Sequence, residues 1–164
     1  MRKILQDYNF LPISINITGK KILLIGGGKV GYHKASILHR FTDDVTVLSP
    51  EFHENFYSLP FQRIRKEYET GDLSGFFLIY ICTGDKALNR RIKADAEALN
   101  ILASVCDNPS LCDFVSPAIH KEGEMTIAVG SNAQDVRRSI AVRNRISELI
   151  KEGVLELFTT LQIK

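Results

Sequence analysis

The sequence predicts an α/β fold, in which a parallel sheet is covered by helices on both of its faces. Short aliphatic segments alternate with segments of helical apolar periodicity between residues 20 and 106. The aliphatic segments are apolar at almost every position, which is typical of parallel strands buried on both faces. A run of three glycines follows the first aliphatic segment and precedes the first helical one. These three observations together predict the fold class.

The strands are predicted from their length and their content of β-branched and aromatic residues. The expected strands are residues 20–26, 44–50, 61–68, 76–84 and 101–106. The third of them is the weakest prediction, because charged residues interrupt it.

Two helices are expected to connect these strands, over residues 29–40 and 85–100. Both segments place apolar side chains at helical spacing. The stripe of the second helix consists of Leu88, Ile92, Ala96 and Leu99. Each helix would therefore bury one face against the sheet.

The pattern changes after residue 107. Residues 107–114 contain the Asp, Asn, Pro and Ser typical of a loop, and residues 115–131 read as two strands joined by a turn. A long helix is expected from Asn132 or Ala133 to Ile150, and a short last helix over residues 154–164. We expect two domains, a dinucleotide-binding domain over 1–113 and a β-hairpin-plus-helix extension over 114–164. A two-stranded hairpin cannot bury its own apolar face, so we expect it to pair with a second copy in a homodimer.

The composition is that of a soluble globular protein, with 45% apolar and 24% charged residues. The net charge of +2 gives no electrostatic reason to expect nucleic acid or a membrane as a partner. The longest apolar stretches are too short to span a bilayer, and the first residues lack the apolar block of a secretory signal. We therefore expect a cytoplasmic protein.

The three cysteines are Cys82, Cys106 and Cys112. They are odd in number, and no nearby histidine pair completes the spacing of a zinc site. We expect reduced thiols and no metal site.

The glycines form a motif with a chemical meaning. Gly26, Gly28 and Gly31 make the pattern G-x-G-x-x-G between a strand and a helix. The first glycine permits a tight turn, the second lets backbone approach a pyrophosphate, and the third allows close helix–strand packing. Lys29 and Val30 belong to the same expected cofactor-binding loop. The motif predicts a Rossmann-type doubly wound sheet that binds a dinucleotide, although a glycine-rich turn without a ligand remains the alternative.

The end of the second strand bears on which dinucleotide is bound. A carboxylate commonly binds the ribose hydroxyls at this place, and here Ser49, Pro50 and Glu51 follow the strand. Glu51 could reach the ribose, or it could be a solvated surface charge. The nearest positive charges, Arg63 and Arg65, lie well along the sequence, so nothing basic is expected to receive a 2′-phosphate. We expect NAD rather than NADP.

Thr83 and Gly84 follow the strand of residues 76–84 at its carboxyl end, where ligands bind in doubly wound sheets. We expect them to line the nicotinamide side of the cofactor site. Small residues at a strand exit are also common without any function.

Five segments together carry a resemblance to a known family. They are "ILLIGGGKVGYHKASIL", "VTVLSPEF", "YICTGDKALNRRI", "SVCDNPSLCDFVSPAI" and "MTIAVGS". In this order they resemble the family of precorrin-2 dehydrogenases and sirohydrochlorin ferrochelatases, which also forms the N-terminal part of bifunctional siroheme synthases. The segment "VCDNPSLCDFVSPA" is the most specific of them, because ordinary dehydrogenases lack it.

The resemblance implies an NAD-dependent enzyme that oxidises precorrin-2 to sirohydrochlorin and works as a homodimer. Some members also insert iron or cobalt into sirohydrochlorin, and whether this chain does so stays open. The resemblance also implies a catalytic role for Asp107, whose carboxylate could accept a proton or stabilise positive charge as hydride departs. The alternative is that Asp107 only caps the turn before Pro109.

The resemblance reaches the extension as well. Ser131 matches a serine that is phosphorylated in some bifunctional relatives and is a candidate substrate contact. Because Asn132 follows it here in place of their glycine, Ser131 could instead cap the long helix. Arg138 is a candidate for binding substrate carboxylates, since precorrin-2 is a polycarboxylate, or it could belong to a solvated basic helix face. Asp113 is expected to be a hydrogen-bonding loop residue, and His120 to be exposed before the hairpin turn.

Two other functions remain possible at this point. The first is a non-catalytic sensor or carrier that binds a dinucleotide or a tetrapyrrole. The second is a small NAD oxidoreductase that acts on an unrelated substrate. The glycine motif together with Asp107 favours the precorrin-2 dehydrogenase, because a sensor needs no acid beside its ligand.

Overall fold

The computed structural model describes residues 8–157 of the chain. The chain divides into two compact units between Val115 and Ser116. This division lies close to the expected domain boundary after residue 113.

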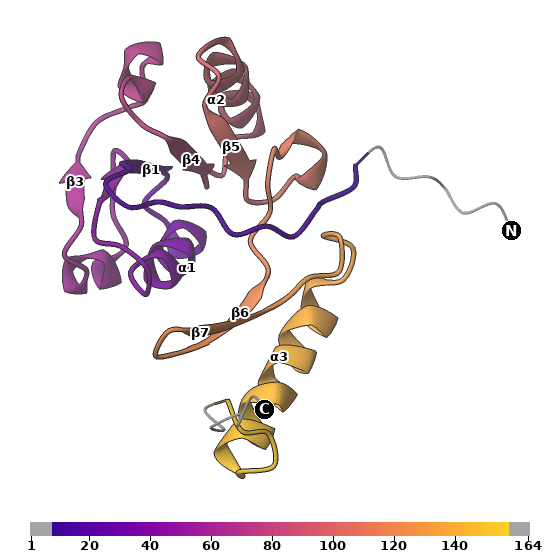
Figure 1. Cartoon of the computed structure of the whole chain (residues 1–164). Helices are drawn as coiled ribbons and strands as arrows, with labels where there is room; N and C mark the ends of the chain where they lie inside the picture. Colours follow the sequence, from indigo (N-terminus) through magenta and orange to yellow (C-terminus); the bar gives the residue numbers. More distant parts are fainter. Residues whose placement is uncertain (1–7, 158–164) are drawn as a thin grey trace, which may run out of the picture. The chain divides into compact units, whose positions relative to one another are not determined.

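The first unit is built from five strands and two α-helices (Figure 1). In chain order they are β1 (Ile22–Ile25), α1 (Lys29–Leu38), β2 (Val45–Leu48), β3 (Gln62–Ile64), β4 (Leu78–Ile81), α2 (Lys86–Ala98) and β5 (Leu102–Val105). All strands are parallel and lie in the order β3-β2-β1-β4-β5. This is the order of the first five strands of a doubly wound sheet, so the predicted Rossmann-type fold is confirmed.

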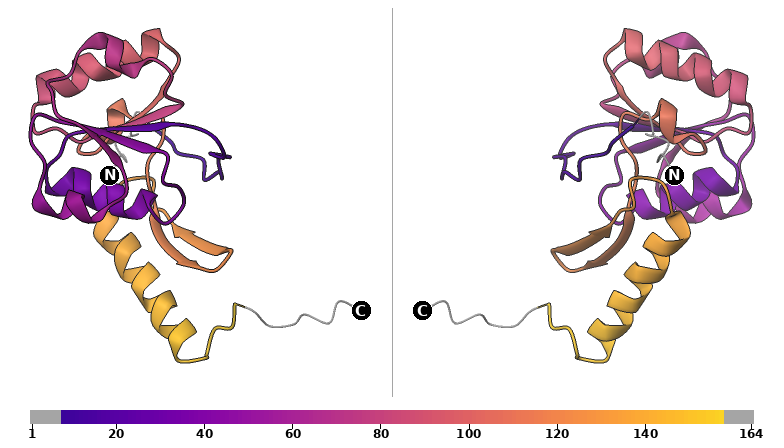
Figure 2. Two further views of the ribbon diagram at one scale, coloured as in Figure 1. Left: turned by 90° about the vertical axis from the view of Figure 1, so that its left-hand side faces the viewer. Right: turned by 90° about the vertical axis from the view of Figure 1, so that its right-hand side faces the viewer.

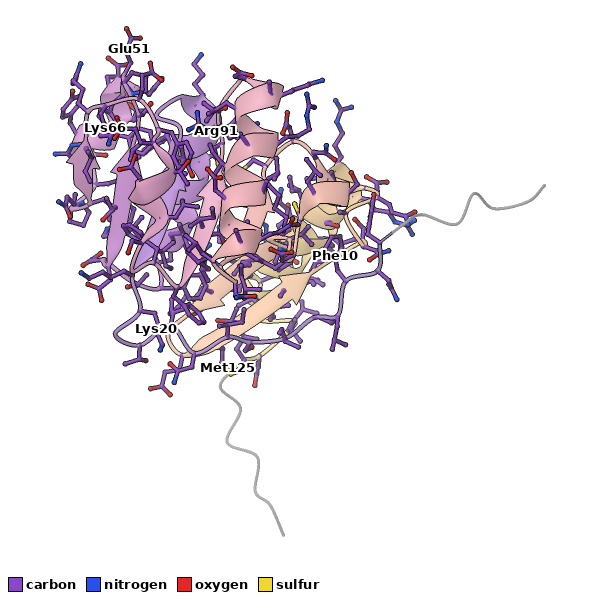
Figure 3. All side chains as sticks on the ribbon, turned by 90° about the horizontal axis from the view of Figure 1, so that it is seen from above. Phe10, Lys20, Glu51, Lys66, Arg91 and Met125 are labelled. Atoms are coloured by element: carbon purple, nitrogen blue, oxygen red, sulfur yellow. The ribbon has the colours of Figure 1, made fainter. Side chains whose placement is uncertain are left out.

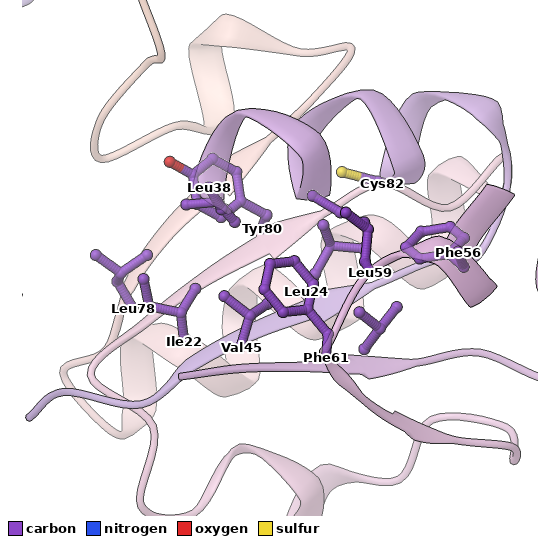
Figure 4. Packing of buried hydrophobic residues seen from close by; sticks show 12 residues of the cluster. Ile22, Leu24, Leu38, Val45, Phe56, Leu59, Phe61, Leu78, Tyr80 and Cys82 are labelled. Atoms are coloured by element: carbon purple, nitrogen blue, oxygen red, sulfur yellow. The ribbon is translucent and has the colours of Figure 1, made fainter. Parts of the chain in front are cut away.

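The helices α1 and α2 cover opposite faces of this sheet (Figure 2). Successive side chains of a strand point to opposite faces, so every strand contributes to two cores. The core on the α1 face contains Ile22, Leu24, Val45, Val47, Leu78 and Tyr80 together with Ala35 and Leu38 of the helix (Figure 4). The core on the α2 face contains Leu23, Ile25, Ile79, Ile81, Ala103 and Val105 together with Ile92 and Ala96. Each buried aliphatic side chain stabilises the fold by about 1.5–3 kcal/mol.

Three short 3₁₀ helices occur in the connections. They are η1 (Glu54–Ser58), η2 (Thr70–Leu73) and η3 (Pro109–Leu111). The sequence analysis missed η1, which buries Phe56 in the core on the α1 face. The expected strand over 61–68 is shorter than predicted. After Ile64 the chain turns into η2, where Lys66 pairs with the carboxylates of Glu69 and Asp72.

The second unit consists of β6 (Ala118–Glu122), β7 (Met125–Val129) and α3 (Val136–Lys151). The two strands form the expected antiparallel hairpin, and Gly123 in its turn has the left-handed φ of 55°. The helix contacts the hairpin through the guanidinium of Arg143, which donates to the carbonyl oxygen of Ile119 at 2.9 Å.

The start of α3 differs from the prediction. Asn132 and Ala133 have φ values of 53° and 57°, and this left-handed backbone cannot belong to a right-handed helix. The helix begins at Val136 instead, where the carboxylate of Asp135 accepts from the amide of Arg138 at 2.8 Å.

Two further expectations for the second unit were wrong or fall outside the described part. His120 is not exposed, because its side chain is only 15% accessible and its Nδ1 lies 2.8 Å from the hydroxyl of Ser147. Residues 154–157 are not helical, and the remainder of the expected last helix, 158–164, lies outside the described residues. None of the helices formed by residues 8–157 combines the length and apolarity needed to cross a bilayer.

Candidate functional site

A groove of about 730 Å³ opens at the carboxyl ends of β1, β2 and β4. The two strands beside β1 belong to the two directions in which the sheet is wound, and ligands of doubly wound folds bind at this switch point. The lining comes from residues 25–29, 48–53, 67–68, 82–85 and Leu88. The structure therefore brings together most of the predicted cofactor residues, namely Gly26, Gly28, Lys29, Ser49, Pro50, Glu51, Thr83 and Gly84. Val30 and Gly31 are not part of this lining.

The glycines of the motif have three different environments. Gly26 has a φ of 117°, and a Cβ there would lie 2.6 Å from the carbonyl carbon of Cys82. A Cβ on Gly31 would overlap the carbonyl oxygen of Gly26, so this glycine seats α1 against the turn. A Cβ on Gly28 would meet nothing within 4 Å. The space above Gly28 is thus open to a ligand, whereas Gly26 and Gly31 are required by packing.

Gly27 is a glycine that the structure requires although the motif does not include it. A Cβ at Gly27 would overlap the carbonyl oxygen of Glu51, and its own carbonyl accepts from the amide of His53 at 2.7 Å. These contacts fix the glycine loop to the segment that follows β2. The signal in the sequence was the unbroken run of three glycines, which exceeds what the motif needs.

The first turn of α1 has unpaired backbone amides, as the first turn of every helix does. Its first amides have no partner within the helix, and Gly28 at the N-cap has no side chain to satisfy them. No acidic residue occupies this turn. Free amides and the positive end of the helix dipole favour an anion such as a phosphate at this place.

The end of β2 supplies one side of the groove. Ser49 is buried, and its amide donates to the carbonyl of Ile64 at 3.1 Å. Glu51 is exposed, and Figure 3 shows its side chain projecting outward. The carboxylate is therefore free to meet a ligand hydroxyl in the adjoining groove.

Positive charge lies nearer to the end of β2 than the sequence indicated. β3 is the neighbour of β2, and Arg65, which follows β3 directly, places its guanidinium 5.8 Å from the centre of the Phe52 ring. Arg65 also donates to the hydroxyl of Tyr57 at 3.2 Å. Distance along the chain was therefore a poor measure of distance in space. Arg63 differs, because its Nη1 is bonded to backbone carbonyls of Phe56, Leu59 and Phe61.

The segment after β4 is held by a buried amide. Asn89 of α2 is 2% exposed, donates from Nδ2 to the carbonyl of Thr83 at 3.1 Å and lies 2.5 Å from its hydroxyl. Asp85 caps α2 by accepting from the amides of Ala87 and Leu88. Sequence reasoning missed Asn89, whose place in an otherwise apolar helix stripe was its only signal.

Asp107 follows β5 and is exposed at the same carboxyl edge of the sheet. It does not line the large groove. It lines a smaller hollow of about 80 Å³ together with Lys86, Asn89 and Arg90 of α2. Asn89 borders this hollow and also holds Thr83 of the large groove, so the two sites share a wall. A carboxylate between cationic side chains can accept a proton or pair with developing positive charge.

Asp113 has the structural role that the sequence predicted. Both of its carboxylate oxygens lie 2.7 Å from the ammonium of Lys93, and one accepts from the amide of Ala103 at 2.9 Å. Lys93 is only 5% exposed and also pairs with Glu97. This pair fastens α2 and the loop after β5 to the sheet.

The two candidates of the second unit lie before and within α3. The hydroxyl of Ser131 accepts from the amide of Asp135 at 3.0 Å, so it stabilises the turn before the helix and is not the helix cap. Arg138 has an exposed side chain. Within residues 8–157, no three His, Cys, Asp or Glu side chains are grouped as a metal site would require.

Comparisons with known proteins agree with this geometry. The family model described as "Putative NAD(P)-binding" matches residues 13–118. The chain is 34% identical to siroheme synthase of Psychrobacter arcticus over 149 residues, which is 88% of this chain and 27% of that protein. It is 35% identical to siroheme synthase of Methylobacillus flagellatus over 144 residues, with coverages of 85% and 31%.

The chain thus spans about a third or less of the length of these curated relatives. The structure also resembles that of "SirC, precorrin-2 dehydrogenase", with a TM-score of 0.73 and 18% identity over 85% of this chain and 70% of that one. This likeness supports the fold. The family match spans the whole parallel sheet, the glycine loop and the groove above it. The chain belongs to this NAD(P)-binding family.

Proposed function

We propose that this chain is an NAD-dependent dehydrogenase that oxidises precorrin-2 to sirohydrochlorin. The observation that carries the proposal is the open space above Gly28, at the start of an uncapped helix and at the switch point of the sheet. The similarity to siroheme synthases and the fold shared with a precorrin-2 dehydrogenase support this substrate. We propose that residues 1–113 bind the cofactor and that residues 114–164 form the dimer contact.

The groove residues suit a dinucleotide. The amides at Gly28, Lys29 and Val30 would bind the pyrophosphate, and Glu51 would accept hydrogen bonds from ribose hydroxyls. Thr83 and Gly84, held by Asn89, would contact the nicotinamide side. When bound, NAD⁺ supplies the acceptor for a hydride from the substrate.

Asp107 is the proposed catalytic residue. Oxidation of precorrin-2 releases a hydride and a proton, and the Asp107 carboxylate would take the proton or stabilise the cation left by the hydride. Lys86 and Arg90 border the same hollow and would attract the carboxylates of the substrate. We also propose Ser131 and Arg138 as substrate contacts, since the guanidinium of Arg138 can pair with substrate carboxylates.

We infer a cytoplasmic homodimer whose contact involves the second unit. Its two-stranded sheet is too small to form an independent core. Several of its apolar side chains are exposed within one chain, namely Met125, Val136, Ile140 and Val142. Burial of such side chains against a second copy would stabilise both. Sedimentation of wild type and of an Ile140→Glu variant tests this. A wild type that is monomeric at every concentration, or a variant as dimeric as the wild type, would contradict it.

The direct test is an anaerobic reaction of the purified chain with NAD⁺ and precorrin-2. NADH and sirohydrochlorin should appear in equal amounts. Binding of NAD⁺ without any NADH would favour the non-catalytic sensor or carrier instead. Sirohydrochlorin with Fe²⁺ or Co²⁺ and no NAD⁺ tests metal insertion separately.

A further inference from the structure

Two cysteines stand side by side where β4 and β5 end. Ile81 and Val105 are register partners, so Cys82 and Cys106, which follow them directly, are neighbours across the two strands. The amide of Cys106 donates to the carbonyl of Ile81 at 2.9 Å, which continues the parallel pairing to this point. Adjacent strands lie about 4.8 Å apart, within the Cα separation of about 4.4–6.8 Å that a disulfide requires.

Both side chains also point to the same face of the sheet. Cys82 is 8% exposed and belongs to the core on the α1 face (Figure 4). Cys106 packs against the same core. The two thiols are close enough to shift each other's pKa in opposite directions. A disulfide between them therefore needs only a local adjustment of the backbone at the ends of β4 and β5.

The two thiols differ in reactivity. The hydrogen bond from Cys82 lowers the pKa of Cys106, and the ammonium of Lys34 adds to this, although burial and Asp107 oppose it. The same hydrogen bond and burial raise the pKa of Cys82. Cys106 is also the more accessible of the two. An accessible thiol with a lowered pKa beside a second thiol is the usual arrangement of an oxidant-sensitive pair.

We propose that Cys82 and Cys106 form a reversible disulfide when the protein meets a hydroperoxide. The Cys106 thiolate attacks the peroxide oxygen, the O–O bond breaks, and the released alkoxide or hydroxide takes a proton. Cys106 is then a sulfenic acid, whose sulfur is attacked by the sulfur of Cys82. The S–O bond breaks and water leaves. Two thiols have been oxidised to one disulfide, and the peroxide has been reduced to water and an alcohol or a second water.

The disulfide forms at the wall of the groove. Cys82 lines the groove, and a Cβ on Gly26 would lie only 2.6 Å from the Cys82 carbonyl carbon. A backbone shift at Cys82 therefore presses directly on the glycine loop or moves Thr83. We expect the oxidised protein to bind NAD⁺ about tenfold more weakly, and this part rests on the proposed function.

Cys112 supplies the matched control. Its sulfur accepts from the amide of Val105 at 3.1 Å and donates to the carbonyl of the same residue at 3.2 Å. It packs against the core on the α2 face, across the sheet from Cys82. Serine can keep these hydrogen bonds, so Cys112→Ser should fold and oxidise as the wild type does.

The test is oxidation with one equivalent of hydrogen peroxide, followed by alkylation and peptide mapping without reduction. Wild type and Cys112→Ser should each lose two thiols and yield a peptide linked through Cys82 and Cys106, which dithiothreitol releases. Cys106→Ser should lose none at this dose, and Cys82→Ser should trap a sulfenic acid on Cys106. A linkage that includes Cys112, or no linkage with wild type, would overturn the proposal.

A second measurement needs no variant. Limited iodoacetamide should alkylate Cys106 of the folded wild type before Cys82, and equal labelling would contradict the order of attack. NAD⁺ titrations of the reduced and oxidised wild type separate the two proposals. A linked pair in a protein that never binds NAD⁺ refutes the proposed function alone, whereas NAD⁺ binding without any linkage refutes the disulfide alone.

Discussion

Gly27 lies so close to the carbonyl oxygen of Glu51 that a Cβ at Gly27 would overlap it, while the next residue, Gly28, faces open space. Two adjacent glycines therefore serve different purposes. Gly27 joins the glycine loop to the segment after β2, and Gly28 leaves room for a ligand. The glycine motif alone cannot make this distinction, but the different surroundings of Gly27 and Gly28 do.

Alanine substitutions at these glycines should separate folding from binding. Gly27→Ala must displace the backbone of Glu51, so we expect it to lower the free energy of unfolding by about 1–3 kcal/mol. Gly28 has an extended backbone, with φ −80° and ψ −172°, and Gly28→Ala should change stability by no more than about 0.5 kcal/mol. Urea unfolding of both variants measures this. Equal destabilisation by the two substitutions would show that the loop geometry is described incorrectly.

The ion pair between Lys93 and Asp113 should matter for stability. Lys93→Met leaves the Asp113 carboxylate without its main partner, and we expect a loss of about 3 kcal/mol in the free energy of unfolding. Lys66 pairs with Glu69 and Asp72 but is itself more exposed than Lys93, so it is the control, and Lys66→Met should have a smaller effect. Chemical denaturation compares the two variants. A loss in Lys66→Met as large as in Lys93→Met would contradict the role of burial.

The stabilisation that the Lys93–Asp113 pair provides should be lost at alkaline pH. Burial lowers the pKa of Lys93, but the hydrogen bonds to Asp113 and Glu97 outweigh it and hold the pKa above the ordinary 10.5. The stabilisation is therefore fully present below pH 10.5 and is lost as pH rises through the higher folded-state pKa. Urea unfolding of wild type and Lys93→Met, at about pH 9 and about pH 11, should show the difference between them shrink at the higher pH. A stability difference between the two proteins that grows with pH would contradict the raised pKa of Lys93.

Glu51 should favour NAD⁺ over NADP⁺. Its carboxylate can accept from ribose hydroxyls and would repel a 2′-phosphate, so Glu51→Ala should weaken NAD⁺ binding roughly tenfold and reduce the preference. Arg65→Ala is the matched control, because Arg65 lies on the Phe52 ring and does not line the groove. Calorimetric titration with both dinucleotides measures the ratio. An unchanged ratio in Glu51→Ala would make this residue a solvated surface charge.

Asp107 should be needed for turnover and not for cofactor binding. Asp107→Ala removes the proposed proton acceptor, and we expect kcat to fall by about a hundredfold or more while NAD⁺ affinity stays the same. Because Asp107 is exposed, Asp107→Ala should fold as the wild type does, and circular dichroism checks this. Turnover of precorrin-2 at the wild-type rate would remove this residue from the mechanism.

The sequence was sufficient for the sheet because its strands are apolar runs with no competing pattern. Ile22–Ile25 and Leu78–Ile81 are buried at every position, and only a central parallel strand has that burial. The start of α3 could not be predicted in the same way. Its helical periodicity extends backwards over Asn132 and Ala133, but their left-handed backbone stops the helix after that point.

The site was predicted where a residue belongs to the glycine motif or lies shortly after a strand. Thr83 and Glu51 lie near strand ends, so their edge of the sheet could be inferred from the chain alone. Asn89 holds Thr83 from the middle of α2, and Arg65 packs on Phe52 from the segment after β3, both through tertiary packing. Their positions depend on which elements are neighbours, and the sequence pattern does not state this.

The central claim is that the space above Gly28 binds the dinucleotide. Calorimetric titration of NAD⁺ into wild type and Gly28→Ala tests it most directly, with Gly71→Ala as a control at an equally open glycine outside the groove lining. We predict one NAD⁺ per chain for wild type and Gly71→Ala, and binding weakened about tenfold or more by Gly28→Ala. Equal NAD⁺ affinity in all three proteins, or no binding by wild type, would contradict the account.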